Sequence, residues 1–278
     1  MTLNFVEHNR SYKHNTYIYP VLSRRSGGIS VGINLNINNA CNWRCVYCQV
    51  DGLIRGKPND LDLVKLESEL ETMIIDLLFS DLLMQLAPDG MQRFNDIAIS
   101  GNGEPTLSKQ LAEVLQIIDK LYQKYNLFTY GIKIILITNG SFANANNIQY
   151  SLELLKKLSA IIWFKIDTVT TDGLLKTNQI HYSILQITNN LKLASSFCNI
   201  QIQTCFFKQN NLLPDTYEVG EYINFLIQNK QYFTMVLLYS VSRPSLLPEG
   251  KNISTVNRDF LDSIANTLRQ HDILVSCY

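Results

Sequence analysis

The chain has 278 residues, of which 46% are hydrophobic, and its 24 basic and 24 acidic side chains give a formal net charge of zero. This length suits one α/β domain or a domain with a small appendage, and the neutral total charge predicts no DNA partner. No apolar stretch approaches the about 20 residues that cross a bilayer. Residues 1–20 are polar and resemble no signal peptide. We therefore expect a cytoplasmic protein without a membrane partner.

The hydrophobic pattern predicts an alternation of strands and helices along the chain. Period-two apolar runs predict strands, and longer segments with a helical period predict helices. The expected strands are 29–37, 96–100, 133–138, 161–167, 200–207 and 234–241. The expected helices are 61–86, 109–125, 148–158, 181–195, 217–229 and 256–270, and a short apolar tail follows at 273–275. Strands that alternate with helices in this way indicate βα units around a parallel sheet.

Three of the six cysteines stand close together just after the first expected strand, at Cys41, Cys45 and Cys48. Three thiolates can hold a metal centre and leave one position open, whereas structural zinc sites and fully protein-ligated iron–sulfur clusters take four ligands. No further cysteine lies between Cys48 and Cys198, so a zinc knuckle would need a remote ligand. A reducing cytoplasm would keep these thiols free for a metal rather than for a disulfide.

A glycine-containing turn follows the second expected strand and reads Ser100-Gly101-Asn102-Gly103-Glu104-Pro105-Thr106-Leu107. Glycine lets the backbone approach a ligand closely, and this turn offers carbonyl groups and a carboxylate to an ammonium group. The cysteine spacing, with Tyr47 directly before the third cysteine, and this turn together resemble the radical S-adenosylmethionine (SAM) superfamily. The turn is most similar to that of the tRNA wyosine-base synthase branch, except that Asn102 replaces a glycine of the family pattern.

This resemblance implies a fold, a domain division and a set of cofactor ligands. The α/β fold would be the partial (β/α)6 TIM-type barrel of the radical SAM core at 29–243, with an N-terminal extension at 1–28 and a C-terminal extension packed on the barrel at 244–278. Cys41, Cys45 and Cys48 would bind a [4Fe–4S] cluster. SAM would contact the following residues: Tyr47, Gly101, Asn102, Gly103, Glu104 and Pro105.

Polar residues at the expected strand ends are further candidates for binding SAM, because function in parallel barrels lies where strands end. Asn139 ends the third strand and is either a ligand contact or a turn residue. Lys165 and Asp167 share a face of the fourth strand, and a lysine in an apolar strand needs a partner, which is either a ligand or a structural ion pair. Gln203 alternates onto a face of the fifth strand that would make the lumen polar.

The chemistry that the resemblance implies is reductive cleavage of SAM to a 5′-deoxyadenosyl radical, which abstracts hydrogen from an unidentified substrate. The electron would come from a flavodoxin- or ferredoxin-type donor. No residue is assigned a catalytic role from the sequence. The other three cysteines, Cys198, Cys205 and Cys277, form no compact group, and we expect inert buried thiols rather than an auxiliary cluster.

Several functions stay open at this point. A nucleobase or tRNA substrate is favoured by the form of the glycine turn and by residues 1–57, which carry seven basic and two acidic side chains. The neutral total charge counts against it. The alternatives are an activase that installs a glycyl radical on a partner enzyme, a non-catalytic iron–sulfur protein, and a zinc protein.

Overall fold

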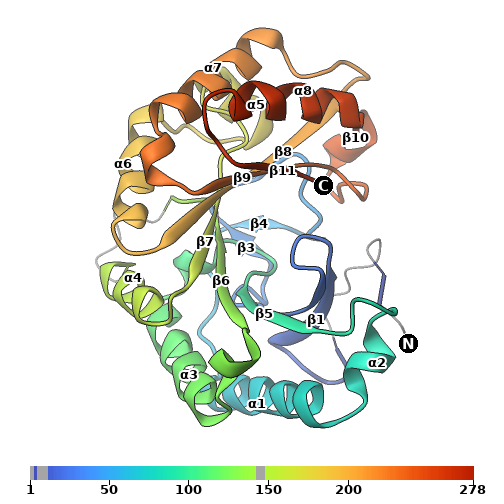
Figure 1. Cartoon of the computed structure of the whole chain (residues 1–278). Coiled ribbons are helices and arrows are strands. Elements are labelled where there is room, and N and C mark those ends of the chain that lie inside the picture. Colours follow the sequence, from blue (N-terminus) through green and yellow to red (C-terminus); the bar gives the residue numbers. More distant parts are fainter. Residues whose placement is uncertain (1–2, 5–11, 142–147) are drawn as a thin grey trace.

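The computed structural model describes residues 3–4, 12–141 and 148–278. Its main feature is one curled sheet that forms a partial barrel with helices on its convex face (Figure 1). In the described part of the chain the strands run in the order β1 (Ile18–Ser23), β2 (Gly28–Ile33), β5 (Phe94–Ile99), β6 (Lys133–Thr138), β7 (Ile161–Lys165), β8 (Asn199–Gln209), β9 (Met235–Ser240) and β11 (Val275–Cys277). A further strand, β10 (Ile253–Thr255), pairs with β8.

All neighbouring strands from β2 to β11 are parallel, and β1 joins the edge in the antiparallel sense. The six expected strands are therefore present and parallel. Two strands at the edges of this sheet were not expected. β1, which lies in the segment assigned to the N-terminal extension, forms a hairpin with β2. β11 overlaps the short apolar tail and adds a strand to the opposite edge of the sheet.

The helices lie in the connections between strands and cover the outer face of the sheet (Figure 1). They are α1 (Leu63–Phe79), α2 (Leu82–Leu86), α3 (Leu111–Lys124), α4 (Ile148–Lys157), α5 (Thr171–Thr177), α6 (Ile184–Ser195), α7 (Thr216–Gln228) and α8 (Arg258–Arg269). No helix in the described ranges is both long and apolar enough to cross a membrane.

Capping side chains set where several helices begin and end. Asp62 accepts a hydrogen bond from the backbone N–H of Lys65 at the start of α1, and Ser183 and Gln186 form a capping box on α6. The expected single helix at 61–86 breaks instead at Ser80, whose N–H and hydroxyl both donate to the Asp76 carbonyl. That bond ends α1 and lets the chain restart as α2.

The two faces of the sheet differ in what they bury. On β7, Ile162 and Phe164 belong to the main apolar core between sheet and helices, whereas Trp163 belongs to a small apolar cluster inside the curl. Lys165, two residues after Trp163, also faces inward and lines a cavity. This period-two alternation gives the barrel a polar lumen within an apolar shell.

Candidate functional site

A cavity of about 350 Å³ opens inside the curled sheet, within the size range of small-molecule sites. Eleven of the residues predicted to bind metal or cofactor line it: Cys41, Cys45, Cys48, Tyr47, Gly101, Asn102, Gly103, Glu104, Asn139, Lys165 and Gln203. The other two, Pro105 and Asp167, lie behind this lining. The fold thus brings segments from five separate parts of the sequence to one place.

The cysteine loop begins at β3 (Ala40–Cys41), which pairs in parallel with β4 (Ile54–Arg55). The Cys48 N–H donates to the Cys45 carbonyl at 2.9 Å and closes a turn between these two cysteines. Burial raises the pKa of Cys41 to about 12 and that of Cys45 to about 11. Burial thus favours the protonated form of both thiols, and binding a metal centre would release protons.

The three thiols line the cavity without converging on one point. Among the described residues, no three Cys, His, Asp or Glu side chains lie close enough together to hold a single metal ion. A zinc ion needs its ligands about 2.3 Å away on all sides, whereas a [4Fe–4S] cluster takes each thiolate on a different iron. The arrangement in the cavity suits the cluster, for which three separated thiols are the required donors.

The glycine turn packs directly against the start of the cysteine loop. A Cβ atom on Gly103 would lie 2.0 Å from the Ala40 carbonyl oxygen, so only glycine fits there. Gly101 has φ +151°, and a Cβ atom at this position would lie 2.4 Å from Asn34 Oδ1. The sequence led us to expect that these glycines let the backbone approach a ligand closely. The same close approach also joins the glycine turn to the cysteine loop.

Asparagine side chains hold this junction together. Asn34 Oδ1 accepts from the N–H groups of Asn36 and Asn102, at 3.0 and 3.1 Å. Asn36 Nδ2 donates to the carbonyls of Ala40 and Glu104 at 2.9 and 3.2 Å. Asn34 and Asn36 directly follow β2 and were not among the predicted site residues, although the strand-end rule would have found them.

Asn102, which departs from the family pattern, has a role of its own. Its side-chain Nδ2 donates to Asn39 Oδ1 at 2.7 Å, and Asn39 in turn donates to the Asp51 carbonyl at 2.8 Å. A glycine at 102 could not make this bond. The substitution therefore adds a link between the turn and the segment that surrounds the cysteines.

The Glu104 carboxylate is largely occupied by hydrogen bonds within the protein. It accepts hydrogen bonds from the N–H and hydroxyl of Thr106, from the Thr138 hydroxyl and from the Asn139 N–H, at 2.6 to 3.1 Å. Three of these bonds fall on Oε1 and one on Oε2, so most of the acceptor positions of the carboxylate are taken by the protein. Burial raises the pKa of Glu104. Glu104 thus fixes the turn to the end of β6, and the turn's backbone is what faces the cavity.

The Asn139 amide is also engaged. Its Nδ2 donates to Asn42 Oδ1 at 3.0 Å, and its Oδ1 accepts from the N–H and hydroxyl of Ser141. Asn42 belongs to the cysteine loop, directly after Cys41. The two interpretations of Asn139 left open by the sequence therefore gain a third, which is support of the cysteine loop from the end of β6.

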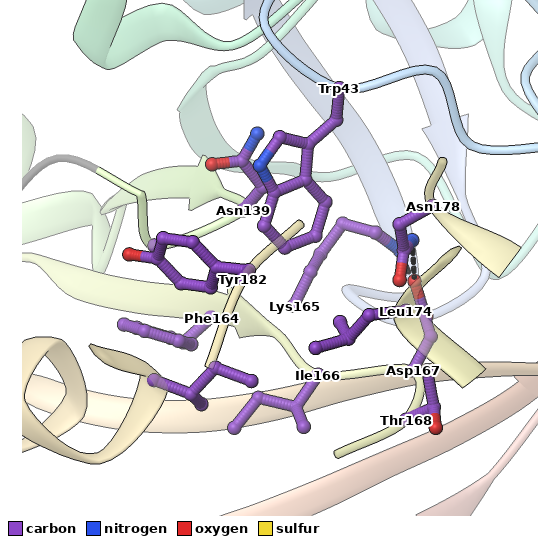
Figure 2. A pocket seen from close by; sticks show the side chains of 12 residues that line it. Trp43, Asn139, Phe164, Lys165, Ile166, Asp167, Thr168, Leu174, Asn178 and Tyr182 are labelled. Carbon is purple, nitrogen blue, oxygen red and sulfur yellow. Dashed lines mark hydrogen bonds and ion pairs between the residues drawn. The ribbon is translucent and has the colours of Figure 1, made fainter. Parts of the chain in front are cut away.

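Asn178 holds the second cysteine from behind, and no sequence pattern marks it. Its Nδ2 donates to Asp167 Oδ2 at 3.0 Å (Figure 2) and to Cys45 Sγ at 3.2 Å. The backbone carbonyl of Asn178 accepts from the Arg44 N–H at 3.1 Å.

Figure 2 shows Asn178 and Asp167 on one side of a small space and Tyr182 and Phe164 on the other, with Trp43 above it. That space is too small for a water molecule. This packing supports the loop and leaves no ligand site there.

Lys165 and Asp167 form a buried ion pair, with Lys165 Nζ 3.5 Å from Asp167 Oδ1. Lys165 also donates to the Tyr239 hydroxyl at 2.8 Å, and Tyr47 donates its hydroxyl proton to Asp167. Burial opposes the charge of Lys165, but Asp167 outweighs it and the pKa of Lys165 is raised. The structural ion pair expected as one alternative is present, and it leaves a fixed positive charge on the cavity wall.

Gln203 provides the clearest sign that the cavity accommodates a ligand. Its Nε2 is buried and has no hydrogen-bond partner in the described part of the chain, while its side chain lines the cavity. A buried donor without a partner costs about 1–3 kcal/mol. An acceptor oxygen on a bound molecule would remove that cost, so the residues present fit a SAM-sized ligand with polar groups.

Comparisons with known proteins give distant sequence relatives and solved structures of similar fold. No family model matches the chain. It is 25% identical over 214 residues to a UPF0026 protein of Helicobacter pylori, covering 69% of this chain and 62% of the relative. It is 30% identical over 161 residues to a UPF0026 protein of Synechocystis sp., covering 58% of this chain and 51% of the relative. The chain therefore spans roughly half to three fifths of these curated relatives.

Solved structures with a similar fold include a radical SAM methyltransferase from Sphaerobacter thermophilus, with a TM-score of 0.59, 11% identity and coverage of 93% of this chain and 68% of that one. For TYW1 with a lysine-pyruvate adduct bound, the TM-score is 0.56 and the identity 14%, with coverage of 93% of this chain and 85% of that one. For a third structure, anSMEcpe with bound AdoMet, the TM-score is 0.55 and the identity 17%, with coverage of 85% of this chain and 60% of that one. At these identities the likeness concerns the fold. This chain has the partial barrel of the radical SAM enzymes, as the resemblance of its motifs implied.

Proposed function

We propose that this protein is a radical SAM enzyme in which Cys41, Cys45 and Cys48 hold a [4Fe–4S] cluster and SAM binds beside it. The observation that carries the proposal is the meeting of these three thiols, the glycine turn and the unpartnered Gln203 on one cavity of a radical SAM barrel. When bound, the cluster and SAM supply reductive cleavage to a 5′-deoxyadenosyl radical that abstracts hydrogen from a substrate.

The chain's own groups position these cofactors and keep water out. Gly103 and Asn36 hold the turn's backbone against the cysteine loop, where its carbonyls can accept from the SAM ammonium group. Gln203 Nε2 and the charged Lys165 offer donors to oxygen atoms of SAM. The apolar cluster of Ala98, Ile135, Trp163 and Leu237 gives part of the inner wall an apolar surface, which disfavours water there.

A flavodoxin- or ferredoxin-type protein is proposed as the electron donor, and a reducing cytoplasmic compartment as the location. Both follow from the cofactor chemistry, because the cluster needs a low-potential electron and its thiols must stay reduced before assembly. The cysteine loop reaches the surface next to β4, whose two residues are exposed. This is the side from which a donor would approach the cluster.

The test is anaerobic reconstitution with iron and sulfide, followed by dithionite and SAM, with 5′-deoxyadenosine measured by chromatography. The parent protein should form 5′-deoxyadenosine, and Cys45→Ala should form none. Cys198→Ala is the matched control, since Cys198 lies outside the cavity lining, and it should behave as the parent does. A parent protein that binds no iron, or binds a cluster and leaves SAM intact, would contradict the proposal.

A further inference from the structure

Arg25 is a partly buried cation, with a buried Nη1, at the end of the lumen away from the cysteines. It lies in the turn between β1 and β2, at the amino-terminal end of the parallel strands, whereas the cysteine loop follows their carboxyl-terminal end. Its guanidinium carbon lies 5.1 Å from the ring centroid of Trp163 and 4.9 Å from that of Tyr239. The two rings occupy the space above the guanidinium, and its N–H groups are left to seek acceptors.

Arg25 forms no direct ion pair in the described part of the chain, and the carboxylate that it influences at longer range is that of Asp96. Arg25 Nη1 is buried without a hydrogen-bond partner. Burial lowers the pKa of Arg25, yet a guanidinium stays protonated in proteins. A buried charge without a partner is strongly unfavourable. An anion that enters the lumen would supply the missing partner.

One more hydrogen-bond donor faces the same cavity, apart from Gln203 Nε2, which is assigned to SAM above. Tyr239 accepts from Lys165 Nζ, and because an ammonium group only donates, the Tyr239 hydroxyl proton needs a separate acceptor. Glu104 is the acidic side chain in the lining, and most of its acceptor positions are occupied by donors of the protein. The donors around Arg25 therefore favour a ligand with acceptor oxygens.

We propose that Arg25 binds an oxyanion group of the substrate, a carboxylate or a phosphate, through its planar N–H donors. That this anion belongs to a substrate rests on the proposed function, whereas the binding of an anion at Arg25 does not depend on it. Guanidinium groups bind both oxyanions in a bidentate manner. An oxyanion held at Arg25 would place the rest of the molecule toward the cysteines, where hydrogen abstraction would occur.

Asp96 is the competing explanation for Arg25. Both residues line a second cavity, of about 770 Å³, at the amino-terminal end of the strands. Asp96 accepts from the Ser30 hydroxyl through Oδ1, and its Oδ2 is buried without a partner. Arg25 also lowers the pKa of Asp96, against the larger effect of burial. If the two side chains pair in solution, Arg25 has a purely structural role. The experiment must separate these two possibilities.

The fluorescence of Trp163 can report binding at Arg25, because the chain has two tryptophans and Trp43→Phe would leave Trp163 as the single one. The full chain in this background would be titrated with inorganic phosphate and, separately, with succinate at constant ionic strength. We expect a saturable change in Trp163 emission with one of the two, which identifies the oxyanion. Arg25→Gln should weaken that binding by about tenfold or more, and Arg25→Lys should weaken it less.

Arg24→Gln is the matched control, because Arg24 lines the same cavity from the same turn but is exposed, and its loss removes the same charge. It should leave the affinity near that of the parent. Failure of both anions to give a saturable change, or equal weakening by Arg24→Gln and Arg25→Gln, would overturn the proposal. So would thermal unfolding in which Arg25→Gln and Asp96→Asn are strongly non-additive, because that result assigns Asp96 as the partner.

The same titration on Cys45→Ala separates this inference from the proposed function. That variant lacks one proposed cluster ligand, while Arg25 and Trp163 are unchanged. It should bind the anion with the parent's affinity. Loss of SAM cleavage together with retained anion binding is the expected pair of results, and loss of anion binding in Cys45→Ala would count against a site that is independent of the cysteine loop.

Discussion

The two faces of the curled sheet follow the same alternation and bury opposite kinds of side chain. On β6, Ile134 and Leu136 join the main core under the helices, while Ile135 and Ile137 face the lumen. The outer face is mostly apolar, and its polar Thr204 on β8 is hydrogen-bonded to Tyr222 of α7. The inner face becomes polar toward the strand ends, where hydrogen-bonded asparagines and acids hold the cysteine loop. The outer face therefore stabilises the fold, and the inner face positions the site.

The largest expected effect on stability lies on the outer face. Leu115 in α3 is fully buried in the main core, and Leu115→Ala should lower the free energy of unfolding by about 2–5 kcal/mol. Denaturant unfolding followed by circular dichroism would measure it. The cluster content per folded molecule should stay at the parent's value. A loss of cluster without a loss of stability would show that the two faces are not separable.

An intermediate effect is expected where the glycine turn meets the cysteine loop. Gly103→Ala forces a Cβ against the Ala40 carbonyl, 2.0 Å away, so the turn or the loop must shift. We expect a loss of about 1–3 kcal/mol in stability together with a marked loss of bound iron after reconstitution. Iron and sulfide analysis of the folded variant measures the second effect.

Gly220 in α7 is the matched control for this substitution. A Cβ there has nothing within 4 Å, and its backbone is helical. Gly220→Ala should therefore raise stability by roughly 0.5–1 kcal/mol and leave the iron content unchanged. An equal loss of iron in both variants would contradict the assignment of Gly103 to the site.

The smallest expected effect concerns a surface ion pair that ties the cysteine loop to the segment after β9. Arg44 Nη1 lies 2.6 Å from Glu249 Oε1, and Gln179 donates to the same oxygen. The hydrogen bond from Arg44 lowers the pKa of Glu249 from 4.5 to about 2. A depressed carboxyl pKa gives stability that is present above about pH 4.5 and is lost as the pH falls toward 2.

Because both side chains are partly exposed, the pair should contribute about 1 kcal/mol or less. Denaturant midpoints at about pH 7 and about pH 4 would be compared for the parent and Glu249→Gln. Relative to the parent, Glu249→Gln should lose most stability at the higher pH, and the stability difference between the two proteins should shrink on acidification. A difference that grows as the pH falls would have the wrong sign for this account.

The local features of the fold and site could be predicted from the sequence. The parallel strands, most of the helices, the three cysteines and the glycine turn depend on residues that are close in sequence. The hairpin of β1 with β2 was also accessible, because two apolar runs flank the Gly27-Gly28 turn. Pro20 within β1 is tolerated because that strand lies at the edge of the sheet.

The support of the site could not be predicted in the same way. Asn178 contacts Cys45 across more than a hundred residues of sequence, and no local pattern marks it. The unpaired state of Arg25 and Gln203 also depends on which side chains the curl brings together. The short helix α5 was missed because it has few residues, although Thr170 caps its start.

The most direct test of the central claim is electron paramagnetic resonance of the reduced, reconstituted protein with and without SAM. The account predicts a [4Fe–4S] signal whose g-values shift when SAM is added, because three thiols leave one iron open to a ligand. A signal that is unchanged by SAM would mean that no iron is available to it. Either that result or the absence of a cluster would contradict a radical SAM site at Cys41, Cys45 and Cys48.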